Sequence, residues 1–389
     1  MQVSSSAQPV HGGNLTWAAI IAGCSPLAIL DFSASINPLG PPPSAIEAIQ
    51  AHLLDVKAYP DPEYGELRSA LSRFHHVPPD WILPGNGSAE LLTWACRDLA
   101  KHDVTCLFTP AFGDYSRALQ AFEAKITTIP LLSWDDDLAD CDLADCDLAI
   151  RIQDRENWIK ADRQIDSTPS HSTRGLLLNN PHNPTGMLLS REQVRSWIDP
   201  FGLVVVDEAF MDFLRLNQQQ SMMDWVQDHP NLVILRSLTK FYSLPGLRLG
   251  YVIAHPDRLR RWQQWRDPWS VNALAVAAAI AVLQDIPFQQ QTWDWLEEAR
   301  LHLFQGLAAL PGLHPLPGAA NFLLVRSESS VLAIQRQLLQ RYQILIRDCM
   351  SFAELGDRFF RVAVRTPAEN QRLLDGLADI LNDQSQESL

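Results

Sequence analysis

Three groups of polar residues follow directly after three apolar runs of the chain. They span residues 179–186 (Asn-Asn-Pro-His-Asn-Pro-Thr-Gly), 207–210 (Asp-Glu-Ala-Phe) and 236–240 (Arg-Ser-Leu-Thr-Lys). In open α/β sheets, ligands bind beyond the carboxyl ends of the strands, so residues at such positions meet at one edge of the sheet. The sequence therefore predicts that an Asn, an Asp, a Ser and a Lys converge at one ligand-binding edge.

Lys240 is the candidate nucleophile of this group. The chain has five lysines, at positions 57, 101, 125, 160 and 240, and only Lys240 comes just past an expected buried strand among small residues. Loss of hydration there would lower the pKa of the amine and free it as a nucleophile. Taken alone, Lys240 is more simply interpreted as a surface lysine after a strand; its polar neighbours favour the nucleophile.

The elements that must position these residues alternate between short apolar runs and longer amphipathic stretches. Each run is bounded by Pro, Asn or charged residues, which is typical of strands covered on both faces. The predicted strands are residues 104–108, 175–178, 203–206, 232–235 and 249–254, and the predicted helices between them include 88–99, 190–198 and 222–228. This pattern predicts an α/β domain with a mostly parallel sheet.

The two ends of the chain lie outside this pattern. The first 40 residues are rich in Gly, Pro and Asn and predict an arm, and Ser44-Ala-Ile-Glu47 predicts a capping box that opens the first long helix. The C-terminal third predicts a smaller α+β domain, with elements at 273–284, 293–309, 321–325, 331–340 and 359–364. The expected domains are residues 1–43, 44–265 and 266–389.

Composition limits the classes of function. The length of 389 residues predicts one to two domains. The 31 Lys and Arg against 45 Asp and Glu give a formal charge of −14, which argues against nucleic acid as a partner, although a small phosphorylated ligand needs only a few local cations. No apolar run reaches about 18 residues and no secretory signal is recognisable, so we expect a soluble, cytoplasmic protein without a membrane partner.

Three local patterns have two interpretations each. Trp262, Trp265 and Trp269 fall at i, i+3 and i+7 among arginines; a helix with a buried aromatic face is favoured over a nucleic-acid patch. The repeat Asp-Leu-Ala-Asp-Cys at 137–146 is interpreted as a solvated acidic stretch rather than a metal site. The six cysteines form no Cys-x-x-Cys pair, so no metal and no disulfide framework is expected.

The polar groups resemble the sequence blocks of a known family. Ser237-Leu-Thr-Lys240 with Pro245-Gly-Leu-Arg248-Leu-Gly250 resembles the lysine region of fold type I pyridoxal 5′-phosphate (PLP) enzymes of the aminotransferase class I/II group. Asn183-Pro-Thr-Gly186 and Asp207-Glu-Ala-Phe210 match two further blocks of that group, in the same order. The resemblance implies a large domain with a mostly parallel sheet sandwiched by helices, and a smaller α+β domain.

The resemblance also implies the roles of individual residues in holding PLP. Lys240 and Asp207 are the implied catalytic residues: Lys240 forms the Schiff base, and Asp207 pairs with the pyridine nitrogen and keeps it protonated, so that the ring acts as an electron sink. Asn183 donates to the phenolic O3′ of the ring. The other implied cofactor-binding residues are Phe112 on the ring face and Gly87, Ser88, Ser237, Arg248 and Tyr59 around the phosphate.

Two of these positions carry a second interpretation or a departure. Phe112 is alternatively an ordinary core aromatic. Many aminotransferases of the group have a Tyr, which donates to O3′, at the place of Phe210. A phenyl ring cannot donate this bond, so the chain departs from those aminotransferases here.

Further blocks closely resemble the threonine-phosphate decarboxylase family of cobalamin biosynthesis, from residue 11 to 380. They begin with His11-Gly-Gly-Asn14 and the loop Asp31-Phe-Ser-Ala-Ser-Ile-Asn-Pro-Leu-Gly40, and continue with residues 59–61, 236–242, 268–273, 344–347 and 361–365. The resemblance implies decarboxylation of O-phospho-L-threonine to (R)-1-amino-2-propanol O-phosphate and CO₂. It implies a homodimer, in which Tyr59 reaches the PLP phosphate of the other subunit.

The substrate-binding residues implied by this family are partly altered here. His11, Gly12, Asn183, Arg347 and Arg361 match the family's substrate ligands. The family's loop Asn is Ser35 in this chain, whose shorter side chain reaches the substrate less well or through water. His11 is alternatively an exposed histidine of the arm. The two arginines are alternatively surface ion-pair residues, but each closes an apolar run, where an arginine usually has an anionic partner.

Two other functions remain to be distinguished. Histidinol-phosphate aminotransferases share the fold, the Lys, the Asp and the phosphate-binding arginines; the His11–Asn14 arm and Phe210 argue against this alternative. A PLP-binding transcription regulator would need a helix-turn-helix module upstream and basic charge, and only some 40 residues precede the first long helix. The decarboxylase is the expected function.

Overall fold

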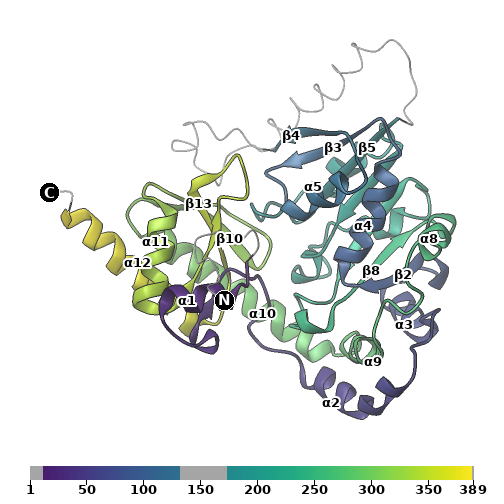
Figure 1. Cartoon of the computed structure of the whole chain (residues 1–389), viewed down its shortest axis with the longest axis horizontal. Helices are drawn as coiled ribbons and strands as arrows, with labels where there is room; N and C mark the ends of the chain where they lie inside the picture. Colours follow the sequence, from purple (N-terminus) through teal and green to yellow (C-terminus); the bar gives the residue numbers. More distant parts are fainter. Residues whose placement is uncertain (1–11, 132–172, 388–389) are drawn as a thin grey trace, which may run out of the picture. The chain divides into compact units, whose positions relative to one another are not determined.

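The computed structural model describes residues 12–131 and 173–387 (Figure 1). Contacts between residues divide the chain into two units. The large unit consists of Gly40–Asn183 and Leu188–Gln289, and the small unit of Met1–Leu39, Pro184–Met187 and Gln290–Leu389. The expected boundary at residue 265 differs from this division. Residues 266–289 belong with the large unit, because helix α9 (Ala273–Val282) packs against α2 (Pro43–Ala51) and α3 (Gly65–His75).

A seven-stranded sheet forms the centre of the large unit. Its order is β2 (Ile82–Asn86), β8 (Leu249–Ala254), β7 (Leu232–Ser237), β6 (Leu203–Asp207), β5 (Arg174–Asn179), β3 (Val104–Thr109) and β4 (Ile126–Pro130). The strands from β7 to β4 are parallel, and β8 runs antiparallel to both of its neighbours. The first four residues of β6, Leu203 to Val206, are fully buried, as expected for a strand covered on both faces. The predicted α/β domain with a mostly parallel sheet is confirmed.

The helices of the large unit begin and end only partly where the sequence predicts. Helix α4 (Ser88–Leu99) matches its prediction, and α5 (Gly113–Gln120) was not predicted. The helix predicted at 190–198 is the short α7 (Arg191–Arg195), which Ser190 and Gln193 cap, and the helix predicted at 222–228 is only the 3₁₀ turn Met223–Trp225. Short helices were overestimated because a periodic apolar pattern also occurs in turns packed on a sheet.

Two predictions about local structure are wrong. Helix α8 (Pro256–Gln263) ends before Trp265 and Trp269, so only Trp262 of the predicted stripe is helical and fully buried. Trp262 is fixed by a polar contact, because its Nε1 donates to the buried Asp98 Oδ2 at 2.9 Å. Ser44 is not an N-cap: α2 begins at Pro43, and the Ser44 hydroxyl instead donates to Asp285 Oδ2 at 2.6 Å.

The small unit contains a four-stranded antiparallel sheet. Its order is β12 (Arg347–Cys349), β13 (Gly356–Ala363), β10 (Phe322–Ser327) and β9 (Leu313–Pro315). The helices of this part of the chain are α10 (Ile286–Ala308), α11 (Val331–Gln337) with the π-helical turn Leu338–Tyr342, and α12 (Pro367–Glu387). These elements confirm the predicted order of helices and strands after residue 290.

The N-terminal region is more ordered than an arm. It forms α1 (Leu15–Ala22) and the short strand β1 (Leu30–Asp31), which pairs in parallel with β11 (Ile344–Leu345). The remaining short helical turns are Pro26–Ala28, Leu53–Lys57, Pro79–Trp81, Met211–Phe213 and Pro245–Leu247. No single helix within the described residues is long and apolar enough to span a membrane; the bent pair α9 and α10 passes by length and composition alone.

Candidate active site

The carboxyl ends of three parallel strands bring the predicted polar residues together in the large unit. Asn179 ends β5 and lies directly opposite Asp207, which ends β6. Ser237 ends β7, the other neighbour of β6, and Lys240 follows three residues later. Asn179, Asp207 and Ser237 therefore end three adjacent strands at one edge of the sheet, and Lys240 follows shortly after the last of them.

A compact corner forms where α4 begins. Ser237 lies opposite Gly250 in the pairing of β7 with β8, and a Cβ at Gly250 would lie 2.5 Å from the Ser88 nitrogen. Gly87 has a φ of +76°, and a Cβ there would lie 2.5 Å from Nη2 of Arg248. The two glycines thus let a hydroxyl, a guanidinium and the N-terminus of a twelve-residue helix meet closely. Such a group of donors suits a phosphate.

The carboxylate of Asp207 accepts two hydrogen bonds. The Tyr115 hydroxyl donates to Oδ2 at 2.8 Å, and the Ala209 N–H donates to Oδ1 at 3.0 Å. Tyr115 is buried, and burial raises its pKa well above the ordinary value, with the Asp207 charge adding to the effect. Tyr115 therefore stays protonated and remains a donor. Both hydrogen bonds fix the orientation of the carboxylate.

Two aromatic rings flank this edge of the sheet. Phe112 lies immediately before α5 and contacts Tyr115 edge to face, with ring centroids 5.6 Å apart. Lys240 Nζ lies 4.7 Å from the ring centroid of Phe210. Asn183, which ends the 179–183 segment of the large unit, is buried.

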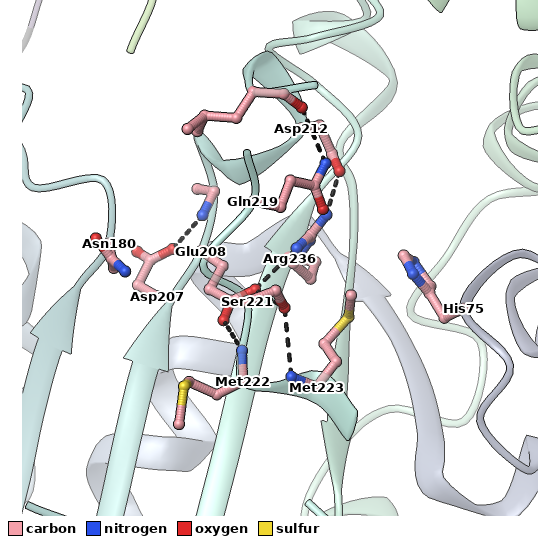
Figure 2. A network of polar contacts seen from close by, with 12 residues as sticks. His75, Asn180, Asp207, Glu208, Asp212, Gln219, Ser221, Met222, Met223 and Arg236 are labelled. Atoms are coloured by element: carbon pink, nitrogen blue, oxygen red, sulfur yellow. Dashed lines mark hydrogen bonds and ion pairs between the residues drawn. The ribbon is translucent and has the colours of Figure 1, made fainter. Parts of the chain in front are cut away.

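Behind Asp207 and Ser237 lies a buried ionic network. Arg236 Nη1 donates to Glu208 Oε2 at 2.8 Å, and Nη2 of the same guanidinium donates to Asp212 (Figure 2). Glu208 also accepts from the Ser221 hydroxyl at 2.6 Å and the Met222 N–H at 2.9 Å. Arg236 and Glu208 are 1% and 0% exposed. The network ties the end of β6 to the end of β7.

Two of the predicted substrate-binding residues face each other in the small unit. Arg347 of β12 pairs directly with Arg361 of β13. Arg347 is buried and donates to the Ser351 hydroxyl at 2.7 Å; Arg361 donates to the Ser33 carbonyl at 3.2 Å. Burial lowers the pKa of Arg361 to about 10, and the Arg347 charge acts in the same direction. Two neighbouring cations with little solvent favour an anionic ligand.

The other predicted substrate-binding residues lie in different surroundings. Gly12 and Arg347 line the same small pocket of the small unit. Ser35 is buried, and its hydroxyl has no hydrogen-bond partner among the described residues. His11 lies outside the described residues, as does the 137–146 repeat. Tyr59 is 79% exposed and stacks on Trp269, with ring centroids 4.5 Å apart.

Comparison with known proteins identifies the family. Residues 28–377 match the family described as "Aminotransferase class I and II". The chain belongs to this family. It is 39% identical to threonine-phosphate decarboxylase of Salmonella typhimurium over 380 residues, which cover 95% of this chain and 96% of the relative. It is 33% identical to histidinol-phosphate aminotransferase of Symbiobacterium thermophilum over 351 residues, 89% of each chain.

Comparison with solved structures gives the same kind of fold. The crystal structure of histidinol-phosphate aminotransferase from Sinorhizobium meliloti, in complex with pyridoxal 5′-phosphate, aligns with a TM-score of 0.78 at 23% identity, covering 99% of this chain and 100% of that one. The predicted fold class, an α/β PLP-dependent enzyme of fold type I, is therefore confirmed. The chain is an enzyme, and PLP is the cofactor of this aminotransferase class I/II member.

The residues at the sheet edge fit this cofactor. A Cβ at Gly87 would fill the space against Arg248, so the corner at the start of α4 is kept open for close approach of a phosphate. The Asp207 carboxylate lies at the carboxyl end of β6 and is oriented by two donors, and a carboxylate is the kind of acceptor that pairs with a pyridinium nitrogen. Within the described residues, no group of three or more His, Cys, Asp or Glu could hold a metal ion.

Two parts of this site were not predicted from the sequence. Tyr115 was not considered, although it lies three residues after Phe112 and so on the same face of a helix that begins there. The Glu208–Arg236–Asp212 network was also missed. Part of its signal was available, since Glu208 and Arg236 each lie next in sequence to a predicted site residue, and successive residues of an extended chain point to opposite faces. Asp212 lies in the turn Met211–Phe213 and gave no such signal.

Proposed function

We propose that this enzyme decarboxylates O-phospho-L-threonine to (R)-1-amino-2-propanol O-phosphate and CO₂, as a step of cobalamin biosynthesis. The observation that carries the proposal is the 39% identity to a threonine-phosphate decarboxylase over almost the full length of both chains. The facing pair Arg347 and Arg361 supports it independently, because a substrate with a carboxylate and a phosphate supplies two anionic groups.

Each residue of the sheet edge has a task in this proposal. Bound PLP supplies a conjugated ring that accepts the electron pair released at the substrate Cα. Asp207 holds a proton at the pyridine nitrogen, and the hydrogen bonds from Tyr115 and Ala209 orient its carboxylate for that purpose. Asn183 orients the ring at O3′, and Phe112 covers one face. Ser237, Arg248 and the Gly87–Ser88 start of α4 hold the phosphate.

Lys240 has two tasks in succession. Its amine would anchor the cofactor before substrate arrives. After the substrate amine has replaced it and passed it a proton, the resulting ammonium would give that proton to Cα once CO₂ has left. Which bond at Cα breaks would depend on how the substrate is held against the conjugated ring. The substrate-binding residues His11, Gly12, Ser35, Asn183, Arg347 and Arg361 are proposed to select that bond. A decarboxylase must turn the carboxylate out of the plane, whereas an aminotransferase must turn the Cα–H there.

We also propose a homodimer in which Tyr59 reaches the cofactor phosphate of the other subunit. Exposed apolar side chains gather near Tyr59: Leu53, Leu54 and Val56 are 54%, 75% and 65% exposed, and Trp269 stacks on the Tyr59 ring. Clustered exposed apolar residues of this kind mark interaction surfaces. Sedimentation equilibrium of the purified chain tests the dimer, and a monomer at micromolar concentration would contradict it.

Histidinol-phosphate aminotransferase is the second candidate, supported by 33% identity to such an enzyme over 89% of each chain. The deciding experiment incubates the PLP-loaded protein with O-phospho-L-threonine and measures CO₂ release and keto-acid formation in the same sample. A parallel sample contains histidinol phosphate and a 2-oxo acid. Decarboxylation predicts stoichiometric CO₂ and aminopropanol phosphate from the first sample only, and Lys240→Ala abolishes it. Amino transfer in the second sample, without CO₂ in the first, establishes the aminotransferase.

A further inference from the structure

Ser33 joins two segments of the small unit that are far apart in the sequence. Its hydroxyl accepts the Gly13 N–H at 2.7 Å, and its carbonyl accepts Nη2 of Arg361 at 3.2 Å. Ser33 is 2% exposed and lines the same pocket as Gly12 and Arg347. One buried residue therefore contacts both the described part of the arm (Gly12–Asn14, called the arm motif below) and one of the paired arginines.

Asp31 fixes the orientation of Ser33. The Asp31 Oδ1 accepts the Ser33 N–H at 2.7 Å and the Ser33 hydroxyl at 2.6 Å. Because the hydroxyl proton is directed to the carboxylate, a lone pair of Ser33 Oγ is left for the Gly13 N–H. Asp31 itself is held by the pairing of β1 with β11 and by Arg365, which donates to its carbonyl at 3.0 Å.

The arm motif packs against this residue without free space. A Cβ at Gly12 would lie 2.3 Å from the Ser33 carbonyl oxygen, so only glycine permits the approach. Gly13 has a φ of +80°, a conformation that glycine adopts without strain. The next residue, Asn14, begins α1 by accepting the Trp17 N–H at 3.0 Å. Steric fit and hydrogen bonding thus place Gly12 and Gly13 at a defined position on Ser33.

We propose that Ser33, oriented by Asp31, is the positioning residue that sets the arm motif and Arg361 at a fixed separation for substrate recognition. This inference rests on the proposed function, in which both the arm and Arg361 bind the phosphorylated substrate. Ser33 acts through its neighbours and does not itself touch the substrate. Its loss is expected to weaken substrate binding, with the cofactor residues of the large unit unaffected.

The test compares Ser33→Ala with the parent enzyme and with Ser33→Thr, which keeps the hydroxyl. Loss of one neutral hydrogen bond corresponds to an increase of about 3- to 10-fold in KM for O-phospho-L-threonine, with kcat and PLP content nearly unchanged. Ser33→Thr is expected to restore most of the affinity. Hydrogen exchange by mass spectrometry is expected to show faster exchange of the Gly13 region in Ser33→Ala by a similar factor.

Ser25→Ala is the matched control. The Ser25 hydroxyl also accepts a backbone N–H of the small unit, that of Leu27 at 3.3 Å, but it is exposed and lies outside the pocket. It is expected to leave KM and exchange of the Gly13 region unchanged. An increase in KM equal to that of Ser33→Ala would overturn the inference, because any lost cap would then have the same effect.

Other outcomes separate this inference from the proposed function. If the parent releases CO₂ from O-phospho-L-threonine and Ser33→Ala changes neither KM nor exchange, the inference is wrong and the proposed function stands. A fall in kcat alone also contradicts positioning of substrate-binding groups. If the parent releases no CO₂, the proposed function fails, and unchanged exchange of the Gly13 region in Ser33→Ala then overturns the positioning contact as well.

Discussion

Arg347 and Arg361 lie directly opposite each other on neighbouring antiparallel strands, so two guanidinium groups share one partly buried region of the small unit. Cross-strand pairs of like charge destabilise a sheet unless an opposite charge lies close by. The lowered pKa of Arg361, caused by burial first and then partly by Arg347, shows that this region disfavours its own charge. Asp348 lies 3.7 Å from Arg347 and offsets part of this cost. Under the proposed function, the anionic groups of the substrate would offset the rest.

The first prediction concerns this pair. Arg361→Met is expected to raise KM for O-phospho-L-threonine by about 10- to 150-fold, the loss expected for one charged hydrogen bond. PLP loading should be unchanged. Inorganic phosphate should raise the melting temperature of the parent, since ligands that bind the native state stabilise it, and should not raise that of the variant. Differential scanning fluorimetry and initial-rate kinetics measure both effects.

Arg358→Met is the control for this prediction. Arg358 is an exposed residue of the same strand and donates to the Ser327 carbonyl at 2.8 Å. Equal losses of affinity in the two variants would mean that general charge, and not the facing pair, attracts the substrate.

The second prediction concerns the carboxylate at the sheet edge. Tyr115→Phe removes one donor to Asp207 and is expected to reduce turnover about 10-fold or more while PLP stays bound. Asp207→Asn is expected to have a much larger effect, because a neutral amide cannot keep the pyridine nitrogen protonated. Turnover and the absorbance spectrum of the bound cofactor are measured for both variants.

Tyr342→Phe is the matched control, because the Tyr342 hydroxyl also donates to an aspartate, Asp379, at 2.8 Å. It should leave turnover unchanged. Full activity of Tyr115→Phe would show that the hydrogen bond from the Tyr115 hydroxyl to Asp207 does not contribute to turnover.

How well the sequence predicts a structural feature depends on whether residues close together in the sequence determine that feature. The strands ending at Asn179, Asp207 and Ser237 were predictable because runs of Leu, Val and Ile covered on both faces leave a clear pattern. Lys240, Asp207 and the corner at Gly87 each lie within a short sequence block that is recognisable by itself. In contrast, α1 was missed, because Leu15–Ala22 is apolar all round and only eight residues long, so it has no amphipathic period.

Features that depend on tertiary pairing were not predictable. The register that sets Arg347 opposite Arg361 requires the alignment of two strands across a bulge between Asp348 and Cys349. Tyr115 reaches Asp207 only because α5 is folded against the sheet, 92 residues away in the chain. Ser44 had the sequence of a helix cap, but its hydroxyl found a stronger partner in Asp285.

The third prediction concerns the buried ionic network. Arg236→Met leaves Glu208 and Asp212 without their cation and is expected to lower the free energy of unfolding by about 3–5 kcal/mol. Arg191→Met breaks an exposed pair with Asp224 and is expected to cost about 0–1 kcal/mol. Urea denaturation followed by circular dichroism compares the two. Similar losses would show that the network contributes no more than a surface pair.

The fourth prediction concerns pH. Burial lowers the pKa of His75 well below 6.5, and its Nε2 lies 2.5 Å from the Tyr251 hydroxyl. The folded chain therefore binds fewer protons at His75 than the unfolded chain does, so this contribution to stability is present above pH 6.5 and is lost as the pH falls. His182, whose pKa burial lowers to about 3, acts in the same direction.

Unfolding free energies at pH 7.5, 6.5 and 5.5 test this expectation. His75→Gln should reduce the slope of stability against pH by up to about 1.4 kcal/mol per pH unit below pH 6.5. An unchanged slope in His75→Gln would mean that the ring is protonated in the folded chain.

The alternation at the ends of β6 and β7 has a consequence for directed evolution. Asp207 and Ser237 bind the cofactor under the proposed function, whereas their immediate neighbours Glu208 and Arg236 form the buried network. Residues proposed to act on the cofactor are thus immediate neighbours in the sequence of residues that stabilise the fold. A saturation library over residues 207–210 and 236–240 would therefore consist mostly of unfolded proteins. A library that varies Phe210 and keeps Glu208, Asp212 and Arg236 unchanged would sample altered reaction preference in proteins that still fold.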